Sequence, residues 1–209
     1  QLFLPFIDLL KQKTDVFELV AARDYRLERL AAAPVWHCPL GAAARAAMDA
    51  AWAGLTAGAE TEGQSLSVQG RRFYLAVTAS GCARLSFAQA CTEARGPADY
   101  LALARHFDAV LIDDIPILTP DRRNEAKRFV TLIDALYEAK TKLVASAAAA
   151  PDALYRQGDG AFEFERTASR LYEMGSRDYL AAGRVMVDAL PEWRGSSTPD
   201  RLPQSEQDA

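Results

Sequence analysis

The sequence predicts an α/β protein, and two features carry that prediction. The first is a strand–helix–strand unit, in which the apolar runs AVLID (109–113) and KLVAS (142–146) flank a helix with one apolar stripe. A strand without alternation is expected when both of its faces are covered, as in a parallel sheet. The second is SLSVQGRRFYLAV (65–77), where apolar and polar residues alternate about a QGR turn. That pattern is typical of a β-hairpin.

The first third of the chain predicts short elements. Residues 2–12 space their apolar side chains like an amphipathic helix, and 16–21 reads as a buried strand. A helix is expected over 24–33, with Asp24 as its N-cap. A loop then leads into a helix of small residues over 42–55, whose Ala-rich face favours close packing against neighbouring elements.

The middle of the chain holds the clearest helix start. A short strand is predicted over 83–87, then a helical turn and a helix over 98–107. After the AVLID strand, Thr119 is expected to be an N-cap, Pro120 suits the first helical position, and Asp121 suits the helix dipole. The apolar stripe of the helix that follows consists of Ala126, Phe129, Val130, Ile133, Leu136 and Tyr137.

The last quarter is predicted to be less regular. Residues 151–160 read as a loop, and 162–174 as a short strand followed by a helix. A final helix or extended arm is expected over 177–190. The segment 191–209 has almost no apolar side chains to bury, so we expect a disordered tail.

Composition argues against several classes of function. The 24 basic and 28 acidic side chains give a net charge of −4 without a basic block, which disfavours nucleic acid as a partner. The three cysteines, Cys38, Cys82 and Cys91, form no CxxC pair, so neither a disulfide framework nor a zinc site is predicted. No apolar run approaches the roughly 20 residues that a transmembrane helix needs. The chain begins at Gln1 within an apolar segment, which we interpret as a cut inside a longer protein.

The strand–helix–strand unit places polar residues where parallel sheets gather function. Asp113 and Asp114 end one strand and Ser146 ends the other, so the three are expected at the same carboxyl edge. In nucleotide hydrolases, one acid at such an edge holds magnesium through water and another polarises the attacking water. This arrangement would therefore suit phosphoryl transfer if a phosphate-binding loop accompanied it.

The phosphate-binding loop is absent from the sequence. None of the 12 glycines is followed by lysine, so the chain contains no GxxxxGK[ST]. Backbone N–H groups of such a loop contribute most of the phosphate binding, and no acidic strand replaces them. We therefore reject Asp113 and Asp114 as metal ligands, and expect them to cap the next turn or to pair with a nearby arginine, such as Arg122 or Arg123.

Other candidate residues are isolated. His37 and His106 lack a second ligand at metal-binding spacing, so packing or surface roles are favoured for both. Arg166 and Arg170 lie four residues apart on one helix face and could clamp a phosphate. Pairing with acids of their own segment is the favoured alternative, and those acids are Glu163, Glu165 and Glu173.

A known family shares several of these segments in the same order. They are LFLPFIDLLK, DYRL (24–27), ARLSFAQAC, ADYLALARHF, the run LIDDIPILTPDRRNEAKRFVTLIDALYEAKTKLVASA, and FEFERTASRLYEM. Together they resemble the C-terminal half of the ZapE-type cell-division ATPases, AAA+ P-loop enzymes with mitochondrial relatives. The resemblance implies that 1–33 is the tail end of a P-loop AAA+ core and 34–63 a helical lid-like segment. It implies that 64–190 is a C-terminal α/β region with the hairpin and the βαβ unit.

The resemblance also implies a function. The family couples ATP hydrolysis to regulation of a protein assembly, the division ring in bacteria, and uses ATP and Mg. Its phosphate loop and its acidic catalytic strand are expected to precede Gln1, so this chain alone is expected neither to bind ATP tightly nor to hydrolyse it. Arg26 and Arg170 are the residues we expect to face nucleotide as sensor-type arginines.

The implied partners are a client protein of the division apparatus or of the inner membrane, and further copies of the full-length protein. The implied location is the cytoplasm, peripheral to the inner membrane. Two alternatives stay open. One is a non-catalytic interaction module that uses the hairpin and the acidic edge, and the other, least favoured, is a magnesium-dependent enzyme built on Asp113 and Asp114.

Overall fold

A computed structural model of the chain describes residues 33–185. The elements predicted over 2–12, 16–21 and most of 24–33, the sensor candidate Arg26, and the tail predicted over 191–209 lie outside the described residues.

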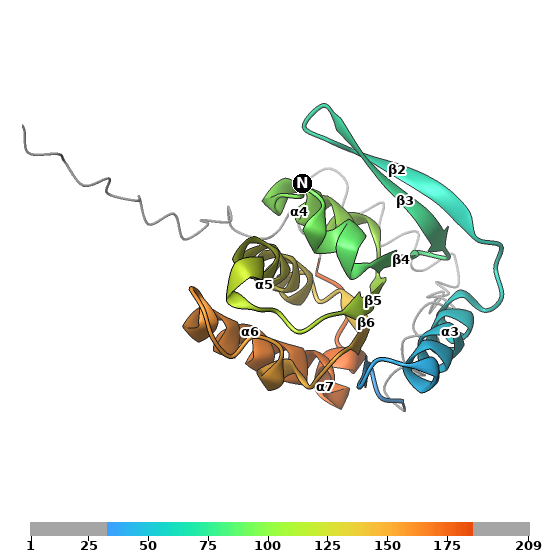
Figure 1. Ribbon diagram of the computed structural model, residues 1–209. Coiled ribbons are helices and arrows are strands. Elements are labelled where there is room, and N and C mark those ends of the chain that lie inside the picture. The colour runs from blue at the N-terminus through green and yellow to red at the C-terminus, as the bar shows by residue number, and fades with distance from the viewer. Residues whose placement is uncertain (1–32, 186–209) are drawn as a thin grey trace, which may run out of the picture.

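A single six-stranded sheet forms the centre of the molecule, in the order β1-β6-β5-β4-β3-β2 (Figure 1). Its strands are β1 (Trp36–His37), β2 (Glu62–Val68), β3 (Arg71–Ala79), β4 (Cys82–Ser86), β5 (Ala109–Ile115) and β6 (Lys142–Ala147). The strands β1, β6, β5 and β4 run parallel, and β3 and β2 extend the sheet antiparallel. The predicted α/β class is therefore confirmed.

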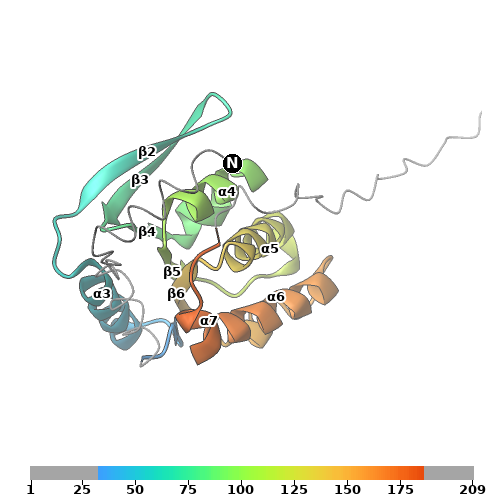
Figure 2. The ribbon, with the colours of Figure 1, turned by 180° about the vertical axis from the view of Figure 1, so that it is seen from behind.

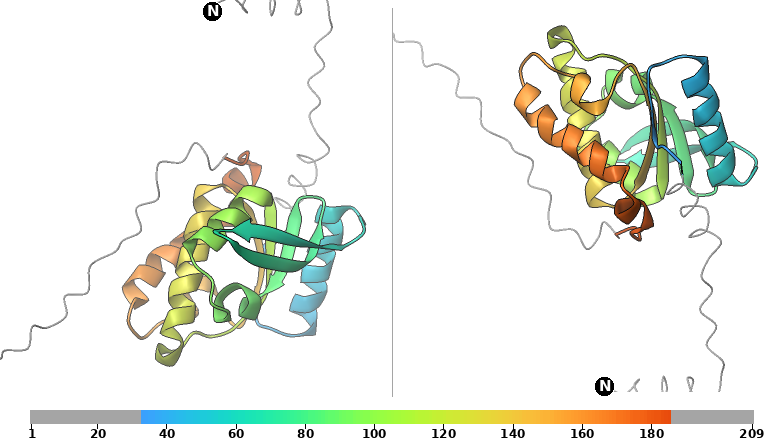
Figure 3. Two further views of the ribbon diagram at one scale, coloured as in Figure 1. Left: turned by 90° about the horizontal axis from the view of Figure 1, so that it is seen from above. Right: turned by 90° about the horizontal axis from the view of Figure 1, so that it is seen from below.

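Helices cover both faces of the sheet. The helices α4 (Pro97–His106), α5 (Arg123–Glu138) and α6 (Ala161–Met174) lie on one side, and α3 (Ala42–Thr56) lies on the other (Figures 1 and 2). The views along the vertical axis show the sheet between these two layers (Figure 3). A short helix, α7 (Arg177–Ala181), follows α6.

The core has two parts, one on each face. Val110 and Ile112 of β5 pack with Phe129 of α5 in the larger cluster. Leu111, between them in sequence, packs with Met48 of α3 in the smaller one. Successive side chains of a strand point to opposite faces. Because both faces are covered, β5 has no polar alternation until it reaches its acidic end, as its sequence predicted.

The βαβ unit β5–α5–β6 is confirmed, with parallel register such as Val110 opposite Leu143. The helix begins later than predicted. Residues Pro120–Arg122 form a 3₁₀ turn, closed by the Arg122 N–H donating to the Thr119 carbonyl at 2.8 Å, and α5 starts at Arg123. Such turns are frequent at the N-termini of α-helices. Thr119 occupies the N-cap position of this turn, as predicted, although its side chain makes no capping bond.

The predicted hairpin is confirmed and is longer than its sequence pattern. Its turn residues Gln69 and Gly70 have φ of 49° and 77°, the left-handed conformation that suits a two-residue hairpin turn. The predicted helical turn after β4 is a π-helical turn over Ala88–Thr92.

Two predictions were wrong. The expected loop after residue 34 contains β1, where Trp36 pairs with Ala145 of β6. The FEF segment is not a strand, because α6 runs unbroken from Ala161. Its buried residues recur every three or four positions, which is the period of a helix rather than of a strand. They are Phe164, Thr167, Ala168, Leu171 and Met174.

The predicted division of the chain at residues 63 and 64 remains a prediction. In the structure β1 and α3, which belong to the expected lid-like segment 34–63, join and cover the same sheet as the later strands. The described residues therefore share one sheet and its two covering layers.

Candidate functional site

Polar side chains replace apolar ones at the carboxyl ends of the parallel strands, on the face that α3 covers. Asp113 of β5 lies opposite Ser86 of β4, and Ser146 of β6 lies opposite His37 of β1. Leu111 and Val144, two positions earlier in β5 and β6, pack against α3, so Asp113 and Ser146 share that face. The strand ends therefore build a polar row across the sheet.

Arg84 of β4 is the centre of this row. Its Nε donates to Asp113 Oδ2 at 2.7 Å and its Nη2 donates to Asp113 Oδ1 at 3.1 Å, which makes a two-pronged pair. Its Nη1 donates to Asp49 Oδ1 of α3 at 2.7 Å. The hydrogen bond to Asp113 and, more weakly, that to Asp49 raise the pKa of Arg84, although burial acts against them. One guanidinium thus joins β4, β5 and α3.

Asp114 is aimed differently from its neighbour. The β5–β6 register shifts between Ile112 and Ile115, and Asp114 adopts a left-handed backbone with φ of 61°. Its N–H donates to Ser146 Oγ at 2.9 Å while its side chain is exposed. Bulges of this kind re-aim side chains at the ends of strands. The prediction that Asp113, Asp114 and Ser146 meet at one edge is confirmed.

A polar cleft of about 350 Å³ lies over these residues. Gln89 lines this cleft, and its Oε1 accepts the Ser86 N–H at 2.8 Å. The lining residues are Arg45, Asp49, Val77, Arg84, Leu85, Ser86, Gln89, Asp113, Asp114 and Ser146.

The donor set of this cleft does not fit magnesium. Mg²⁺ takes oxygen ligands in near-octahedral geometry, usually with one or two free carboxylates. Both oxygens of Asp113 face the Arg84 guanidinium, whose positive charge opposes a divalent cation at the same carboxylate. Within residues 33–185 no group of three or more histidine, cysteine, aspartate or glutamate side chains is arranged to hold a metal ion.

An arginine does pair with Asp113, but it is neither of the two that were predicted, Arg122 and Arg123. Arg122 pairs with Glu125 and Arg123 with Asp159. The alternation of ARLSF places Arg84 on the face opposite Ala83 and Leu85, and that signal was available in the sequence. Which acid would meet Arg84 depends on the pairing of β4 with β5, which the sequence pattern does not specify.

Arg170, one of the two sensor candidates, lies between α6 and α5. Its guanidinium donates to Asp134 and, at 3.2 Å, to Glu138 Oε1, and it lies 4.8 Å from the ring centre of Tyr137. Arg166 also reaches Asp134, at 3.6 Å. The acids that pair with Arg170 therefore come from α5, not from its own segment. Its nucleotide role remains a prediction, as does that of Arg26.

The histidines and cysteines are not brought together. Burial lowers the pKa of His37, whose Nε2 has no hydrogen-bond partner among the described residues. His106 Nδ1 lies 2.9 Å from the carbonyl of Ala102 in its own helix. Cys82 and Cys91 are buried, and Cys38 is exposed.

Of the helices in the described part of the chain, none has the length and apolar character to cross a membrane.

Comparison with known proteins places this sequence in a family. A family model described as AFG1-like ATPase matches residues 1–183. Cell division protein ZapE of Escherichia coli K12 is 39% identical over 178 residues, which are 85% of this chain and 48% of that protein. Lactation elevated protein 1 homolog B of Danio rerio is 34% identical over 179 residues, 84% of this chain and 36% of that protein. The chain thus spans about half, or less, of the length of these curated relatives. No solved structure matches it.

Proposed function

This chain belongs to the AFG1-like ATPase family, and on that premise we propose that it is the C-terminal part of an AAA+ P-loop ATPase. The whole protein would couple ATP hydrolysis to regulation of a protein assembly of the division-ring type. The observation that carries this proposal is the family match over residues 1–183, together with 39% identity to a cell division protein.

The cleft supports a non-catalytic role for this part of the protein. Asp113 is held by Arg84, and the donor set does not fit Mg²⁺, so the Mg of the family would be held by residues outside this cleft. This chain would couple the nucleotide site to the partner protein, because its sheet and helices would transmit conformational changes from one to the other.

An ATPase assay on two proteins tests the proposal. The 209-residue chain with Mg²⁺ and ATP is expected to show no turnover above background, whereas the longer protein that contains it turns over. Asp114→Ala in the short chain is the matched control for a contaminating ATPase, since it alters the exposed acid of the cleft and little else. Turnover by the short chain that Asp114→Ala removes would overturn the proposal.

Arg26 and Arg170 are our proposed nucleotide-facing arginines. In the longer protein, Arg26→Ala and Arg170→Ala are expected to raise the KM for ATP or lower kcat. Arg166→Ala is the control for Arg170, because Arg166 is a neighbouring arginine of α6 that touches the same Asp134 yet is 63% exposed. Equal effects of Arg170→Ala and Arg166→Ala on turnover, or no effect of either sensor variant, would remove the assignment.

The second candidate is a non-catalytic interaction module, and the hairpin favours it. The strand β2 is the edge of the sheet, and the neighbouring β3 carries Tyr74 with 60% of its surface exposed. Exposed tyrosines and open strand edges are common in protein-binding surfaces. Binding of a client that does not change when ATP is added to the longer protein would favour this candidate over the coupling role.

We also propose partners and a location for the whole protein. The partners would be a client protein of the division apparatus or of the inner membrane, and further copies of the full-length protein. The location would be the cytoplasm, peripheral to the inner membrane. The similarity to a cell division protein supports these proposals. Cell fractionation and cross-linking of the longer protein would test them.

A further inference from the structure

The strand β2 leaves one edge of the sheet open. It is the last strand in the order of the sheet, and no strand of the described residues pairs with its outer side. Natural sheets protect such edges with lysine, with proline or by keeping the strand very short. The seven residues of β2 include neither lysine nor proline, and their one charge, Glu62, is at the first position. The backbone groups of β2 are therefore available to an added strand.

The two faces of the hairpin β2–β3 differ. Leu66 of β2 and Phe73 of β3 are buried in the larger core cluster. Because successive side chains of a strand point to opposite faces, the residues next to them are turned away from the core and are exposed. We call this side the outer face of the hairpin, and it consists of Gly63, Ser65, Ser67, Arg72 and Tyr74.

On the outer face, β2 carries only small residues, and the long side chains belong to β3. Ser65 lies opposite Tyr74, and Ser67 lies opposite Arg72. The Tyr74 ring lies across β2, since a Cβ atom at Gly63 would be only 2.9 Å from Tyr74 Cζ. Neighbouring strands are about 4.8 Å apart, so an extended arginine on β3 is long enough to cross a serine of β2. A strand added at β2 would therefore lie within reach of the Tyr74 hydroxyl and the Arg72 guanidinium.

Arg72 is the one charged residue of the outer face. It has no acidic partner among the described residues. Its neighbour Arg71 is turned to the other face, where it pairs with Asp99 of α4 at 3.3 Å. A guanidinium binds a carboxylate with two parallel hydrogen bonds. The outer face therefore favours an acidic partner.

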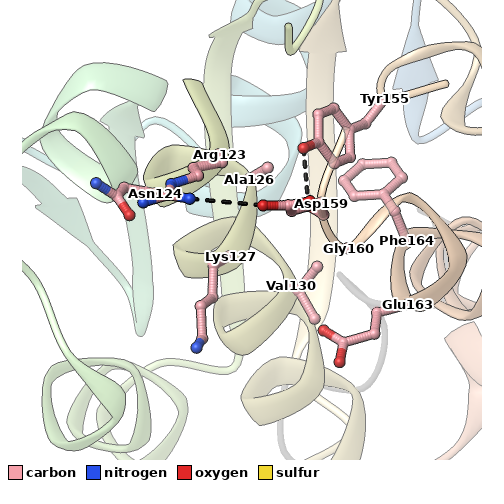
Figure 4. A pocket seen from close by; sticks show the side chains of 10 residues that line it. All are labelled: Arg123, Asn124, Ala126, Lys127, Val130, Tyr155, Asp159, Gly160, Glu163 and Phe164. Carbon is pink, nitrogen blue, oxygen red and sulfur yellow. Dashed lines mark hydrogen bonds and ion pairs between the residues drawn. The ribbon is translucent and has the colours of Figure 1, made fainter. Parts of the chain in front are cut away.

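The pocket between α5 and α6 has no such preference (Figure 4). Its rim carries Arg123 and Lys127 together with Asp159 and Glu163. Arg123 and Asp159 pair with each other at 3.5 Å. The charges of that rim cancel, whereas Arg72 leaves an uncancelled positive charge on the hairpin.

We propose that the β2 edge binds an extended acidic segment of a partner protein as an additional strand of the sheet. This inference rests on the second candidate function, the interaction module, and names the chemistry of its partner. Backbone hydrogen bonds to β2 supply the affinity. A carboxylate of the added strand pairs with Arg72 and supplies the specificity. A second copy of the hairpin does not fit this site, because its outer face offers another Arg72 and no carboxylate.

Fluorescence anisotropy with labelled peptides and the 209-residue chain tests the proposal. The probe is a short peptide in which valine alternates with threonine and glutamate, so that its glutamates lie on one face of a strand. A second peptide has lysine in place of glutamate. The acidic peptide is expected to bind about tenfold more tightly than the basic one at low salt. The net charge of the chain, −4, opposes this preference, so the preference reports a local site.

Charge reversal identifies the residue that selects the peptide. Arg72→Glu is expected to weaken binding of the acidic peptide about tenfold or more and to strengthen binding of the basic one. Arg177→Glu is the matched control, because it reverses an exposed arginine of α7, away from the hairpin (Figures 1 and 2). It is expected to change either affinity by less than about twofold. Far-UV circular dichroism confirms that each variant is folded.

N-methylation of the acidic peptide tests the backbone pairing. Methylating two successive N–H groups blocks one donor on each edge of the strand, because successive N–H groups point to opposite edges. The charge of the peptide does not change. The methylated peptide is nevertheless expected to bind about tenfold more weakly or worse, since its backbone can no longer pair fully with β2.

Four outcomes would overturn the proposal. They are equal affinities for the acidic and basic peptides, equal effects of Arg72→Glu and Arg177→Glu, unchanged binding of the methylated peptide, and no binding of the acidic peptide up to about 1 mM. The last is also the result expected if a second copy, or another segment of this chain, already occupies the edge. The measurements involve neither ATP nor a client, so a negative result removes this edge without bearing on ATP hydrolysis or on client binding elsewhere.

Discussion

At the scale of single residues, Arg84 shows how a charge in a strand can organise a sheet edge. Its guanidinium is only 18% exposed and Asp113 is 21% exposed, so most of the pair is removed from water. Arginine suits this position better than lysine because its planar fork matches a carboxylate with two parallel bonds. The pair joins two parallel strands directly, and its third bond reaches α3.

Arg84→Met is expected to lower the free energy of unfolding by about 2 kcal/mol, because it leaves the half-buried Asp113 carboxylate without its partner. The measurement is urea unfolding followed by circular dichroism. Arg84→Met combined with Asp113→Asn should recover part of the loss, since the amide carries no charge to compensate. Arg45→Met, which alters an exposed arginine of the same cleft, is the control and should change stability by less than about 0.5 kcal/mol. Equal losses for Arg84→Met and Arg45→Met would contradict this account.

Lys142 is a buried cation at the opposite end of the sheet. It is 1% exposed, and its Nζ donates to the carbonyls of Tyr179 and Ala182 at 2.7 and 2.6 Å. Burial, and to a smaller extent the charge of Lys140, lowers the pKa of Lys142 from 10.5 to about 8. It fixes the end of α7 against β6 while carrying a charge that is costly to bury.

The lowered pKa gives a pH dependence with a defined sign. Between pH 8 and 10.5 the unfolded chain holds this proton and the folded chain releases it, so the contribution of Lys142 to stability rises with pH in that window. The unfolding free energy of the wild type minus that of Lys142→Met is therefore expected to increase by on the order of 1–2 kcal/mol from pH 7 to 9.5. The measurement stops at pH 9.5, below the ordinary pKa of tyrosine. Burial raises the pKa of the adjacent Tyr179, so above that ordinary pKa the contribution of Tyr179 to stability falls with pH and would oppose that of Lys142. A flat or falling difference would refute the assignment.

At the scale of elements, the contact between α5 and α6 depends on an arginine as well as on apolar packing. Phe129 of α5 stacks on Phe164 of α6 with ring centres 6.1 Å apart. Beside them Arg170, 20% exposed, reaches Asp134 and Glu138. This geometry gives Arg170 a structural role whether or not it also senses nucleotide.

Arg170→Met is expected to lower the unfolding free energy of the 209-residue chain by about 1–2 kcal/mol, since Asp134 is only 14% exposed and loses its principal partner. Arg166→Met, which removes a more exposed and more distant arginine, is expected to cost less than about 0.5 kcal/mol. Thermal and urea unfolding of both variants make the comparison. If Arg170→Met were as stable as the wild type, the ion pairs seen on α6 would contribute nothing to the fold.

The elements that could be predicted were those whose sequence pattern matched their packing. The unalternating AVLID run predicted a strand covered on both faces, and the QGR turn predicted a hairpin, because each pattern reflects local geometry. The FEF segment was misread because three residues of alternation match a strand, although the helical period continues through Leu171 and Met174. The strand β1 could not be found, since two residues carry no period and are ordered by pairing with β6.

The candidate site was predictable only along one strand–helix–strand unit. Asp113, Asp114 and Ser146 were placed together because carboxyl ends of adjacent parallel strands meet. Arg84 and Asp49 were missed because they reach the site from β4 and α3, whose positions follow from the order of the whole sheet. Long-range pairing of this kind is not encoded in local periodicity.

At the scale of the whole molecule, the sheet is the structure that both layers share. Phe129 belongs to the cluster beneath α4, α5 and α6, and Met48 to the cluster beneath α3, and both are fully buried. The residues of β5 contribute alternately to the two clusters. If either layer detached, the apolar side chains on the face that it covers would be exposed to water. This arrangement favours one cooperative unfolding transition for the described residues.

We therefore expect Phe129→Ala to lower the unfolding free energy by about 3–5 kcal/mol and Met48→Ala by about 2–4 kcal/mol, both through a shift of the same transition. Tryptophan fluorescence and far-UV circular dichroism should follow that transition with coincident midpoints in urea, since Trp36 and Trp52 pack against different clusters. Tyr74→Ala, on the exposed face of the hairpin, is the control and should leave the midpoint nearly unchanged, because it removes a side chain that contributes to neither cluster. If Met48→Ala moved only the fluorescence transition, or if two separate transitions were resolved, α3 would be an independently unfolding unit. That result would support the prediction that the lid-like segment over 34–63 is a separate structural element. A single cooperative transition would argue against that prediction.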